Sequence, residues 1–324
     1  MSFFPQLVAG PIERATNLLP QILSKRKFEY NEAVSGLKQI LWGLFKKMVI
    51  ADNCAYYANY IFDNSSDLSG STLLFGAIFF TFQIYGDFSG YSDIAIGTAR
   101  LFGFNLMQNF AFPYFSRDIA EFWRRWHISL STWFRDYLYI PLGGSRGGTW
   151  MKVRNTFIIF IVSGFWHGAN WTFVIWGALN ALYFLPLLLT KRNRQNLEVV
   201  ARDSYFPSIK EIGQMSLTFI LTVIAWIFFR AENIGYAISY LSEIFSYSLF
   251  KVPYYEGIGL AASTLMLLIF FIIMEWLGRG NQYAIENFTF LKGRFLRWIF
   301  YSFIIFLIGM FMHTEETEFI YFQF

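Results

Sequence analysis

Three histidines are the side chains of this sequence best suited to acid–base chemistry: His127, His167 and His313. A neutral imidazole can accept a proton from a hydroxyl group, because its pKa in water lies near neutral pH. His167 lies within residues 155–189, a run of 35 residues without Asp, Glu, Lys or Arg. An ionisable group in such an apolar run is costly to bury and usually faces a cavity. His167 is therefore the first candidate for a general base.

The other two histidines have different surroundings in the sequence. His127 lies on the apolar side of an expected helix over residues 118–136, one turn from Trp123. Two interpretations stay open for it: a second site residue, or an anchor that holds this helix by hydrogen bonding. His313 follows the last expected membrane span and precedes an acidic stretch, so we predict an interfacial residue.

Carboxylates and arginines supply further candidates. Asp87 follows an apolar run, close to two glycines and a second aspartate. This pattern predicts a kinked helix facing protein or water, and Asp87 belongs either to a site or to a structural hydrogen-bond network. Asp136 is either a site carboxylate or part of an ion pair with its neighbour Arg135. Arg124 and Arg125 either contact an anionic donor or form a charged face at the lipid headgroups.

Several other kinds of site are not predicted. The sequence has no Gly-x-Ser-x-Gly elbow, no His-Glu-x-x-His motif and no P-loop. With three histidines and a single cysteine, Cys54, neither a protein-ligated metal nor an internal disulfide is expected. Cys54 is expected to be a small buried apolar residue. The basic residues form short clusters between apolar runs, a pattern typical of cytoplasmic loops rather than of a nucleic-acid surface.

The composition indicates an integral membrane protein. Of the 324 residues, 55% are hydrophobic and only 15% are charged. Soluble domains carry about 25% charged residues. Aromatic residues make up 22% of the chain, which suits a protein with aromatic belts at two membrane interfaces. Residues 1–20 lack the pattern of a signal peptide, so targeting is expected to come from internal spans.

The elements that must position these residues are expected to be helices. The run over residues 155–189 would be about 50 Å long as one helix, and a bilayer core is about 30 Å thick. We therefore expect a break at residues 164–170, which contain His167. Irregular backbone at membrane depth has to be buried in protein or line a polar cavity. The other expected elements are a surface helix over 31–50, the amphipathic helix over 118–136, and spans over 71–86, 212–229, 257–274 and 298–312.

Loop charges predict the orientation. The segments 190–211 and 278–297 are rich in Lys and Arg, and the segments 230–256 and 313–324 are poor in them. The positive-inside rule then places the two basic segments in the cytoplasm and the C-terminus outside. We expect one multi-pass domain over residues 1–324 in the cytoplasmic (inner) membrane of a bacterium.

Five segments, in the same order, resemble the bacterial alginate O-acetyltransferase branch of the membrane-bound O-acyltransferase family. The opening and the end of the chain, residues 3–12 and 319–324, are similar to this branch as well. The five segments are Gln83-Ile-Tyr-Gly-Asp-Phe-Ser-Gly-Tyr-Ser-Asp-Ile-Ala95, Asn109-Phe110 with Pro113-Tyr114, Glu121-Phe-Trp-Arg-Arg-Trp-His-Ile-Ser-Leu130, Arg135-Asp-Tyr-Leu-Tyr-Ile-Pro-Leu-Gly-Gly144 and Gly164-Phe-Trp-His-Gly-Ala-Asn-Trp171.

The resemblance implies an all-α bundle of membrane helices, some re-entrant or amphipathic, around a central funnel or tunnel. It implies that His167 lies at the centre of the bundle and that His127 is the second family histidine. An acyl group, acetyl by default, would come from acetyl-CoA or another cytoplasmic thioester, with no permanently bound cofactor. It would cross the membrane to hydroxyls of an exported polysaccharide, often through a partner acetyltransferase of the SGNH-hydrolase type. Related teichoic-acid D-alanylation proteins take their acyl group from a carrier protein.

On this interpretation His167 deprotonates the acceptor hydroxyl and His127 polarises or orients a reactant. Asp136 or Asn170 tunes a histidine, and the sequence does not decide between them. The same resemblance makes four further residues candidates for contact with a substrate; they are Asp87, Arg124, Arg125 and Trp166.

Two other functions remain open. Members of the family usually carry several spans before the segment that here begins at Phe3, so we expect an N-terminally truncated chain. An inactive remnant of an acyltransferase is therefore one alternative. The other is a transporter of a polysaccharide or an acyl carrier, for which a broken helix near His167 would also be suitable.

Overall fold

All regular elements in the described part of the chain are helices, as expected from the sequence. The computed structural model describes residue 5 and residues 10–255, 258–287 and 293–313. Most of the opening segment 3–12 and all of the closing segment 319–324 lie outside these residues. The α-helices are α1 (Ala15–Leu23), α2 (Tyr30–Leu44), α3 (Asp52–Asp63), α4 (Gly70–Leu101), α5 (Ile119–Arg125), α6 (Ile128–Phe134), α7 (Thr149–His167), α8 (Trp171–Leu189), α9 (Ile209–Arg230), α10 (Ile234–Ile244), α11 (Ile258–Gly278) and α12 (Arg294–Phe311).

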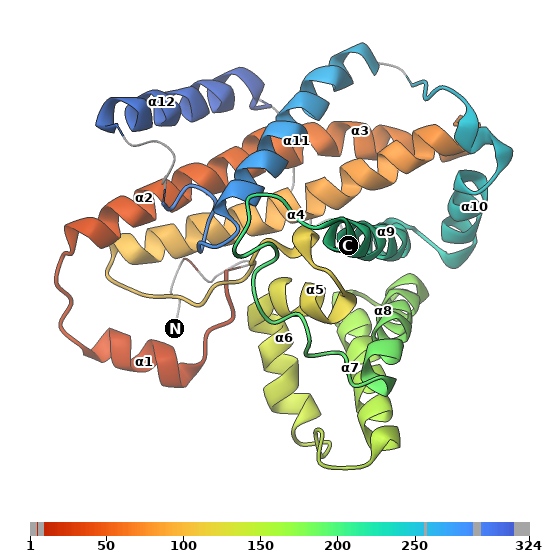
Figure 1. The fold of residues 1–324 in the computed structure, drawn as a ribbon, viewed down its shortest axis with the longest axis horizontal. Coiled ribbons are helices and arrows are strands. Elements are labelled where there is room, and N and C mark those ends of the chain that lie inside the picture. Colours follow the sequence, from red (N-terminus) through yellow and green to blue (C-terminus); the bar gives the residue numbers. More distant parts are fainter. Residues whose placement is uncertain (1–4, 6–9, 256–257, 288–292, 314–324) are drawn as a thin grey trace.

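Three consecutive helical segments, α2, η2 (Phe45–Ala51) and α3, form one long rod. The π-helical segment η2 joins α2 to α3, and α4 lies alongside this rod (Figure 1). The two backbones approach closely where Gly43 meets Gly90, since a Cβ on Gly43 would lie 2.7 Å from the carbonyl oxygen of Gly90. The helix expected over 31–50 is thus present as α2 and η2, and it packs along α4. Lys46 of η2 is only 3% exposed, because its side chain extends from the rod to Asp93 of α4.

In the part of the chain that the structure describes, four helical segments are long and apolar enough to cross a membrane. They are α8, α9, residues 261–278 of α11, and α12. The last three correspond, with shifted ends, to the spans expected over 212–229, 257–274 and 298–312. The expected span over 71–86 forms the first half of α4, which is not among the four. Buried polar side chains such as Gln83 and Asp87 interrupt the apolar character of that helix.

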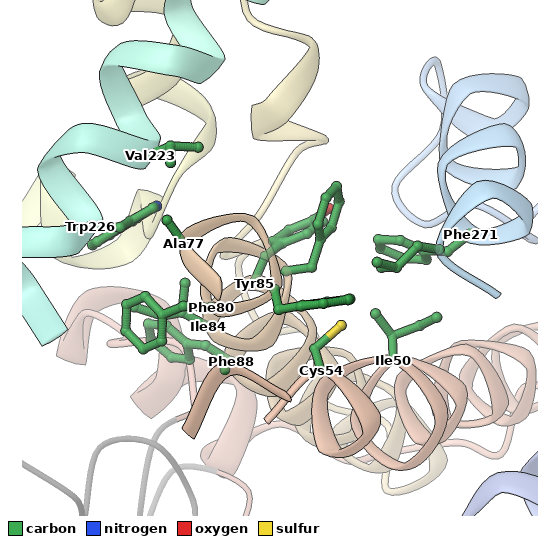
Figure 2. Packing of buried hydrophobic residues seen from close by; sticks show 14 of the residues in the cluster. Ile50, Cys54, Ala77, Phe80, Ile84, Tyr85, Phe88, Val223, Trp226 and Phe271 are labelled. Atoms are coloured by element: carbon green, nitrogen blue, oxygen red, sulfur yellow. The ribbon is translucent and has the colours of Figure 1, made fainter. Parts of the chain in front are cut away.

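The hydrophobic core surrounds α4. Figure 2 shows Phe80, Ile84 and Phe88 of α4 on the side that faces Trp226 of α9. Tyr85 points the other way, toward Phe271 of α11, with ring centroids 5.9 Å apart. Cys54 lies on the same side and is fully buried, as predicted for a small apolar residue. The core therefore holds α4, α9 and α11 in fixed positions around the residues described next.

Candidate functional site

His167 is the last residue of α7, where the chain breaks before α8. Residues 168–170 form the break, within the segment 164–170 that the sequence predicts. Asn170 caps α8, since its side-chain oxygen accepts a hydrogen bond from the backbone N–H of Thr172 at 3.1 Å. Its amide nitrogen donates to the carbonyl oxygen of Glu232 at 2.7 Å. Asn170 thus fixes the break against the α9–α10 connection.

Two glycines allow α7 and α8 to pack face to face as a tight hairpin. A Cβ on Gly164 would lie 2.2 Å from the carbonyl oxygen of Phe173. A Cβ on Gly177 would lie 2.2 Å from the carbonyl oxygen of Phe160. Both distances are far below van der Waals contact, so no larger residue fits at either position without moving a helix. The hairpin therefore brings the residues of α8 back over the end of α7.

Aromatic rings from α8 and α9 surround the imidazole of His167. Trp176 lies edge-on to it, with centroids 5.3 Å apart, and Phe229 does so at 5.0 Å. Phe173 adds a third ring at 6.3 Å. Apolar surroundings favour the neutral imidazole over the charged one. His167 is only partly buried, so part of its side chain can be reached from outside the protein.

His127 lies at a turn, which corrects the expected continuous helix over 118–136. The chain leaves the helical conformation at Trp126, and α6 begins one residue after His127. His127 itself has φ 42° and ψ 56°, the left-handed conformation that few residues other than glycine adopt. Asp118 does cap the start of α5, as its side chain accepts from the backbone N–H of Glu121. The apolar stripe of the sequence is therefore shared between two short helices.

The imidazole of His127 is buried among aromatic rings. Phe88 lies edge-on to it with centroids 4.6 Å apart. Phe110 stacks nearly parallel to it at 6.4 Å. The ring is thus held by aromatic packing from α4 and from the segment between α4 and α5. The side chain is 9% exposed, so it belongs to the core rather than to the outer surface of an amphipathic helix.

A ladder of aromatic rings connects the two histidines. From Trp176, which contacts His167, it continues to Trp226 at 5.7 Å and then to Trp126 at 5.1 Å. Trp126 contacts Phe110 at 5.0 Å, and Phe110 lies against His127. The histidines therefore belong to one continuous cluster built from α4, α7, α8, α9 and the α5–α6 turn. The sequence did not indicate Trp176 or Trp226, because nothing in their spacing shows which helices fold together.

The other candidate residues are engaged elsewhere in the structure. Asp136 accepts from Arg14 at 3.0 Å and from Arg135 at 2.8 Å, which is the local ion pair considered above, extended by a third residue. Its hydrogen bonds with Arg135 and Arg14 lower the pKa of Asp136 below that of a free aspartate. Trp166 is 64% exposed, and its ring lies 6.4 Å from that of Trp133.

Arg124 and Arg125 brace the loop between α8 and α9. The guanidinium of Arg124 donates to the carbonyl oxygens of Asn193 and Asn196, both at 2.8 Å. That of Arg125 pairs with the buried Glu121 at 2.8 Å and donates to the carbonyl oxygen of Glu198, in the same loop, at 3.3 Å. These contacts hold a segment that is itself rich in basic residues. The arginines therefore have a structural task, whether or not they also contact a donor.

Asp87 and Asp93 form ion pairs between α4 and the rod. Lys47 contacts Asp87 at 2.9 Å, and Lys46 contacts Asp93 at 2.5 Å. Lys46 also donates to Ser89 at 2.9 Å. A structural polar network, one of the two interpretations given for Asp87, is thus present. The sequence could not pair these groups, because each lysine lies at least 40 positions from its aspartate.

A cavity of about 320 Å³ opens beside the rings of Tyr85 and Tyr114. Its lining is almost wholly aromatic and aliphatic, and Glu275 of α11 is its one carboxylate. That carboxylate accepts from Trp42 Nε1 at 3.0 Å and from the Tyr85 hydroxyl at 2.5 Å. Tyr85 and Tyr114, which also line the cavity, both contact Trp126. Tyr85 also contacts Phe110 at 6.0 Å, so the rings of Tyr85 and Phe110 connect the cavity to His127.

Comparison with known proteins agrees with the motifs. The model of the membrane-bound O-acyltransferase family matches residues 1–218. A probable alginate O-acetylase of Pseudomonas aeruginosa is 38% identical over 286 residues, which are 87% of this chain and 52% of that protein. A peptidoglycan O-acetyltransferase of Helicobacter pylori is 42% identical over 243 residues, 74% of this chain and 45% of that protein.

A more distant relative is a teichoic acid D-alanyltransferase of Bacillus subtilis, 30% identical over 192 residues, 56% of this chain and 48% of that protein. The chain spans about half the length of the curated relatives it matches. Both histidines lie within the residues that the family model covers. Since that model covers most of the chain, whose described residues include four helices long and apolar enough to cross a membrane, the protein is a member of the membrane-bound O-acyltransferase family.

Proposed function

We propose that this chain is a membrane O-acyltransferase that moves an acetyl group from a cytoplasmic thioester to a hydroxyl of an exported polysaccharide, with His167 as general base. The observation that carries the proposal is the placement of His167 at the α7–α8 break. There a neutral, partly exposed imidazole is surrounded by Trp176, Phe229 and Phe173. The names of the relatives, which are acetylases and acyltransferases, support the same reaction class.

The chemistry needs one base and no covalent protein intermediate. The acceptor oxygen attacks the carbonyl carbon of the thioester, while His167 takes the hydroxyl proton. A C–O bond forms, the C–S bond breaks, and the proton passes from the imidazolium to the departing thiolate. A positioned base of this kind contributes about 10²- to 10⁴-fold in rate. The ester, the free thiol and neutral His167 remain, so atoms and charge balance.

His127 would polarise or orient one of the reactants. It is joined to His167 through the aromatic ladder, so the position of each imidazole depends on the same packed rings. The cavity beside Tyr85 and Tyr114 is a suitable place for the apolar part of the donor, because its wall is aromatic and reaches Trp126. Mostly apolar cavities with few polar groups are typical of small-molecule sites.

The charges of the loops support one direction of transfer. Residues 190–211 and 278–297 are richer in Lys and Arg than residues 230–256 and 313–324, and they would face the cytoplasm, where a thioester donor is made. The C-terminus would then lie outside the inner membrane of a bacterium. The acceptor hydroxyl would belong to the polysaccharide itself or to a partner of the SGNH-hydrolase type, which would then pass the acyl group to the polysaccharide.

The acetyl content of cell-surface polysaccharide tests this proposal. Cells lacking their own activity would express the chain or its His167→Ala variant, with membrane levels compared by immunoblot. We expect acetylation with the chain and none with the variant at equal levels. Equal acetylation in both strains would refute the role of His167. Uptake or export that depends on the proton gradient, without any acyl turnover, would favour a transporter instead.

A further inference from the structure

The left-handed backbone of His127 has to be imposed by its surroundings. A residue with a side chain adopts this conformation at a cost and keeps it only when nearby contacts fix it. No helix continues through the residue, because α5 ends at Arg125 and α6 begins at Ile128. The contacts that hold the turn are therefore those made by the residues on either side of His127.

Asn109 accepts three hydrogen bonds from the residues that follow His127. Its backbone carbonyl accepts a hydrogen bond from the N–H of Ile128 at 2.9 Å. Its side-chain oxygen accepts from the hydroxyl of Ser129 at 2.9 Å and from the backbone N–H of the same residue at 3.4 Å. Two residues further on, the N–H of Ala111 donates to the carbonyl of Arg125 at 2.9 Å. The segment 109–111 is thus hydrogen-bonded to the chain both before and after His127.

The other end of the Asn109 side chain is attached to α4. Its amide nitrogen donates to the hydroxyl of Ser92 at 3.1 Å. Ser92 lies one helical turn after Phe88, whose ring contacts His127 at 4.6 Å. One face of α4 therefore supplies both the ring that packs on the imidazole and the hydroxyl that holds the amide. Asn109 and Ser129 are fully buried, so water does not replace these bonds.

We propose that Asn109 is a positioning residue that sets the orientation of the His127 imidazole by clamping the α5–α6 turn to α4. The role requires an amide, because the side chain accepts on one side and donates on the other. The importance of this clamp for catalysis rests on the acyl transfer proposed above. The effect of the clamp on the geometry of His127 is independent of that proposal and can be measured without any substrate.

Nuclear magnetic resonance of the histidine rings provides that measurement. The full chain, labelled with ¹³C-histidine and placed in lipid nanodiscs, contains three histidines, which replacement one at a time assigns. The ring signal of His127 depends on its orientation toward Phe88. We expect Asn109→Ala to shift that signal and to leave the signal of His167 in place. Ser92→Ala and Ser129→Ala, which remove one hydroxyl each, should shift it less and serve if the alanine variant fails to fold.

Asn155→Ala is the matched control. Asn155 is also fully buried, and its amide donates to the carbonyls of Leu142 and Gly144, away from the clamp. This variant should leave the His127 signal unchanged. An unmoved His127 signal in all three clamp variants would overturn the proposal. So would equal shifts of the His127 and His167 signals, because the effect would then be a general loosening of the core.

Kinetic measurements test whether the clamp matters for the reaction. Displacement of a catalytic group by about 1 Å can reduce turnover by about a hundredfold. Asn109→Ala should therefore lower kcat by about tenfold to a hundredfold, with a smaller change in KM for the thioester. A shifted His127 signal with unchanged kcat would remove the functional part of the proposal. If the unaltered chain transfers no acetyl group, the proposed function fails while the spectra still test the clamp.

Discussion

The ring of Phe88 stands edge-on to the imidazole of His127, with centroids 4.6 Å apart, and its two neighbours along α4 form the buried polar network. Asp87 is paired with Lys47, and Ser89 accepts a hydrogen bond from Lys46. The helix thus presents an aromatic ring to the candidate site and hydrogen-bonding groups to the rod. A disturbance of either face is expected to reach the other through α4.

Replacement of His127 can separate its backbone role from its imidazole. Asparagine adopts the left-handed conformation readily, whereas valine does not. We expect the free energy of unfolding of His127→Asn to lie within about 1 kcal/mol of that of the unaltered chain. That of His127→Val should be lower by about a further 1–2 kcal/mol. Both variants should lose acyl transfer, because both lack the imidazole. Chemical unfolding in detergent and a transfer assay would measure the two effects.

The outcome for the asparagine variant is decisive. If His127→Asn folds well and still transfers acetyl groups at the normal rate, the imidazole is dispensable and His127 is only a turn residue. If His127→Val is as stable as His127→Asn, the left-handed conformation does not constrain this position.

Lys46 and Asp93 should be strongly coupled. Their ion pair, 2.5 Å long, is buried between η2 and α4, so removal of one partner leaves an unpaired charge in the core. We expect Lys46→Met to destabilise the protein by about 3–5 kcal/mol and Lys46→Met with Asp93→Leu to cost less than the single change. The free energy of unfolding in detergent would be measured for each variant.

The exposed pair Arg202–Glu198 is the control for that experiment. Its side chains are mostly exposed, so Arg202→Met should cost less than about 1 kcal/mol. Additive effects of the Lys46 and Asp93 changes would contradict the coupling.

Arg124 should control the order of the loop between α8 and α9. Lysine keeps the charge but cannot reproduce the planar fork that reaches the carbonyls of Asn193 and Asn196. Arg124→Lys should therefore raise hydrogen exchange around residues 193–196, and Arg202→Lys, a change at an exposed arginine, should not. If exchange stays unchanged while KM for the thioester rises, Arg124 acts on the donor instead of the loop.

The break at His167 could be predicted because bilayer thickness limits the length of one helix. An uncharged run of 35 residues is too long for a single span. Within it, Gly164 and Gly168 lie before and after His167. The turn at His127 could not be predicted in the same way. An apolar stripe at helical spacing fits one straight helix as well as two short ones, and the bonds to Asn109 that decide between them are long-range.

Lys46 illustrates the same limit for charged residues. A lysine near the end of an apolar segment usually lies at the membrane surface, which is what its sequence context predicts. Its partner Asp93 lies on another helix, and only the fold shows that α4 packs against η2 at this point. Local patterns therefore indicated which elements exist, while pairings between distant segments required the structure.

Acetyl transfer by the purified chain tests the central claim most directly. The chain would be placed in nanodiscs with an isotopically labelled acetyl thioester and a soluble hydroxyl acceptor, and labelled ester would be counted. His167→Gln should reduce the rate by at least about a hundredfold, which is within the usual contribution of a positioned base. His313→Gln, a change at an exposed histidine next to α12, should leave it unaltered. Equal rates in the unaltered chain and the His167→Gln variant would contradict the assignment of His167 as the base.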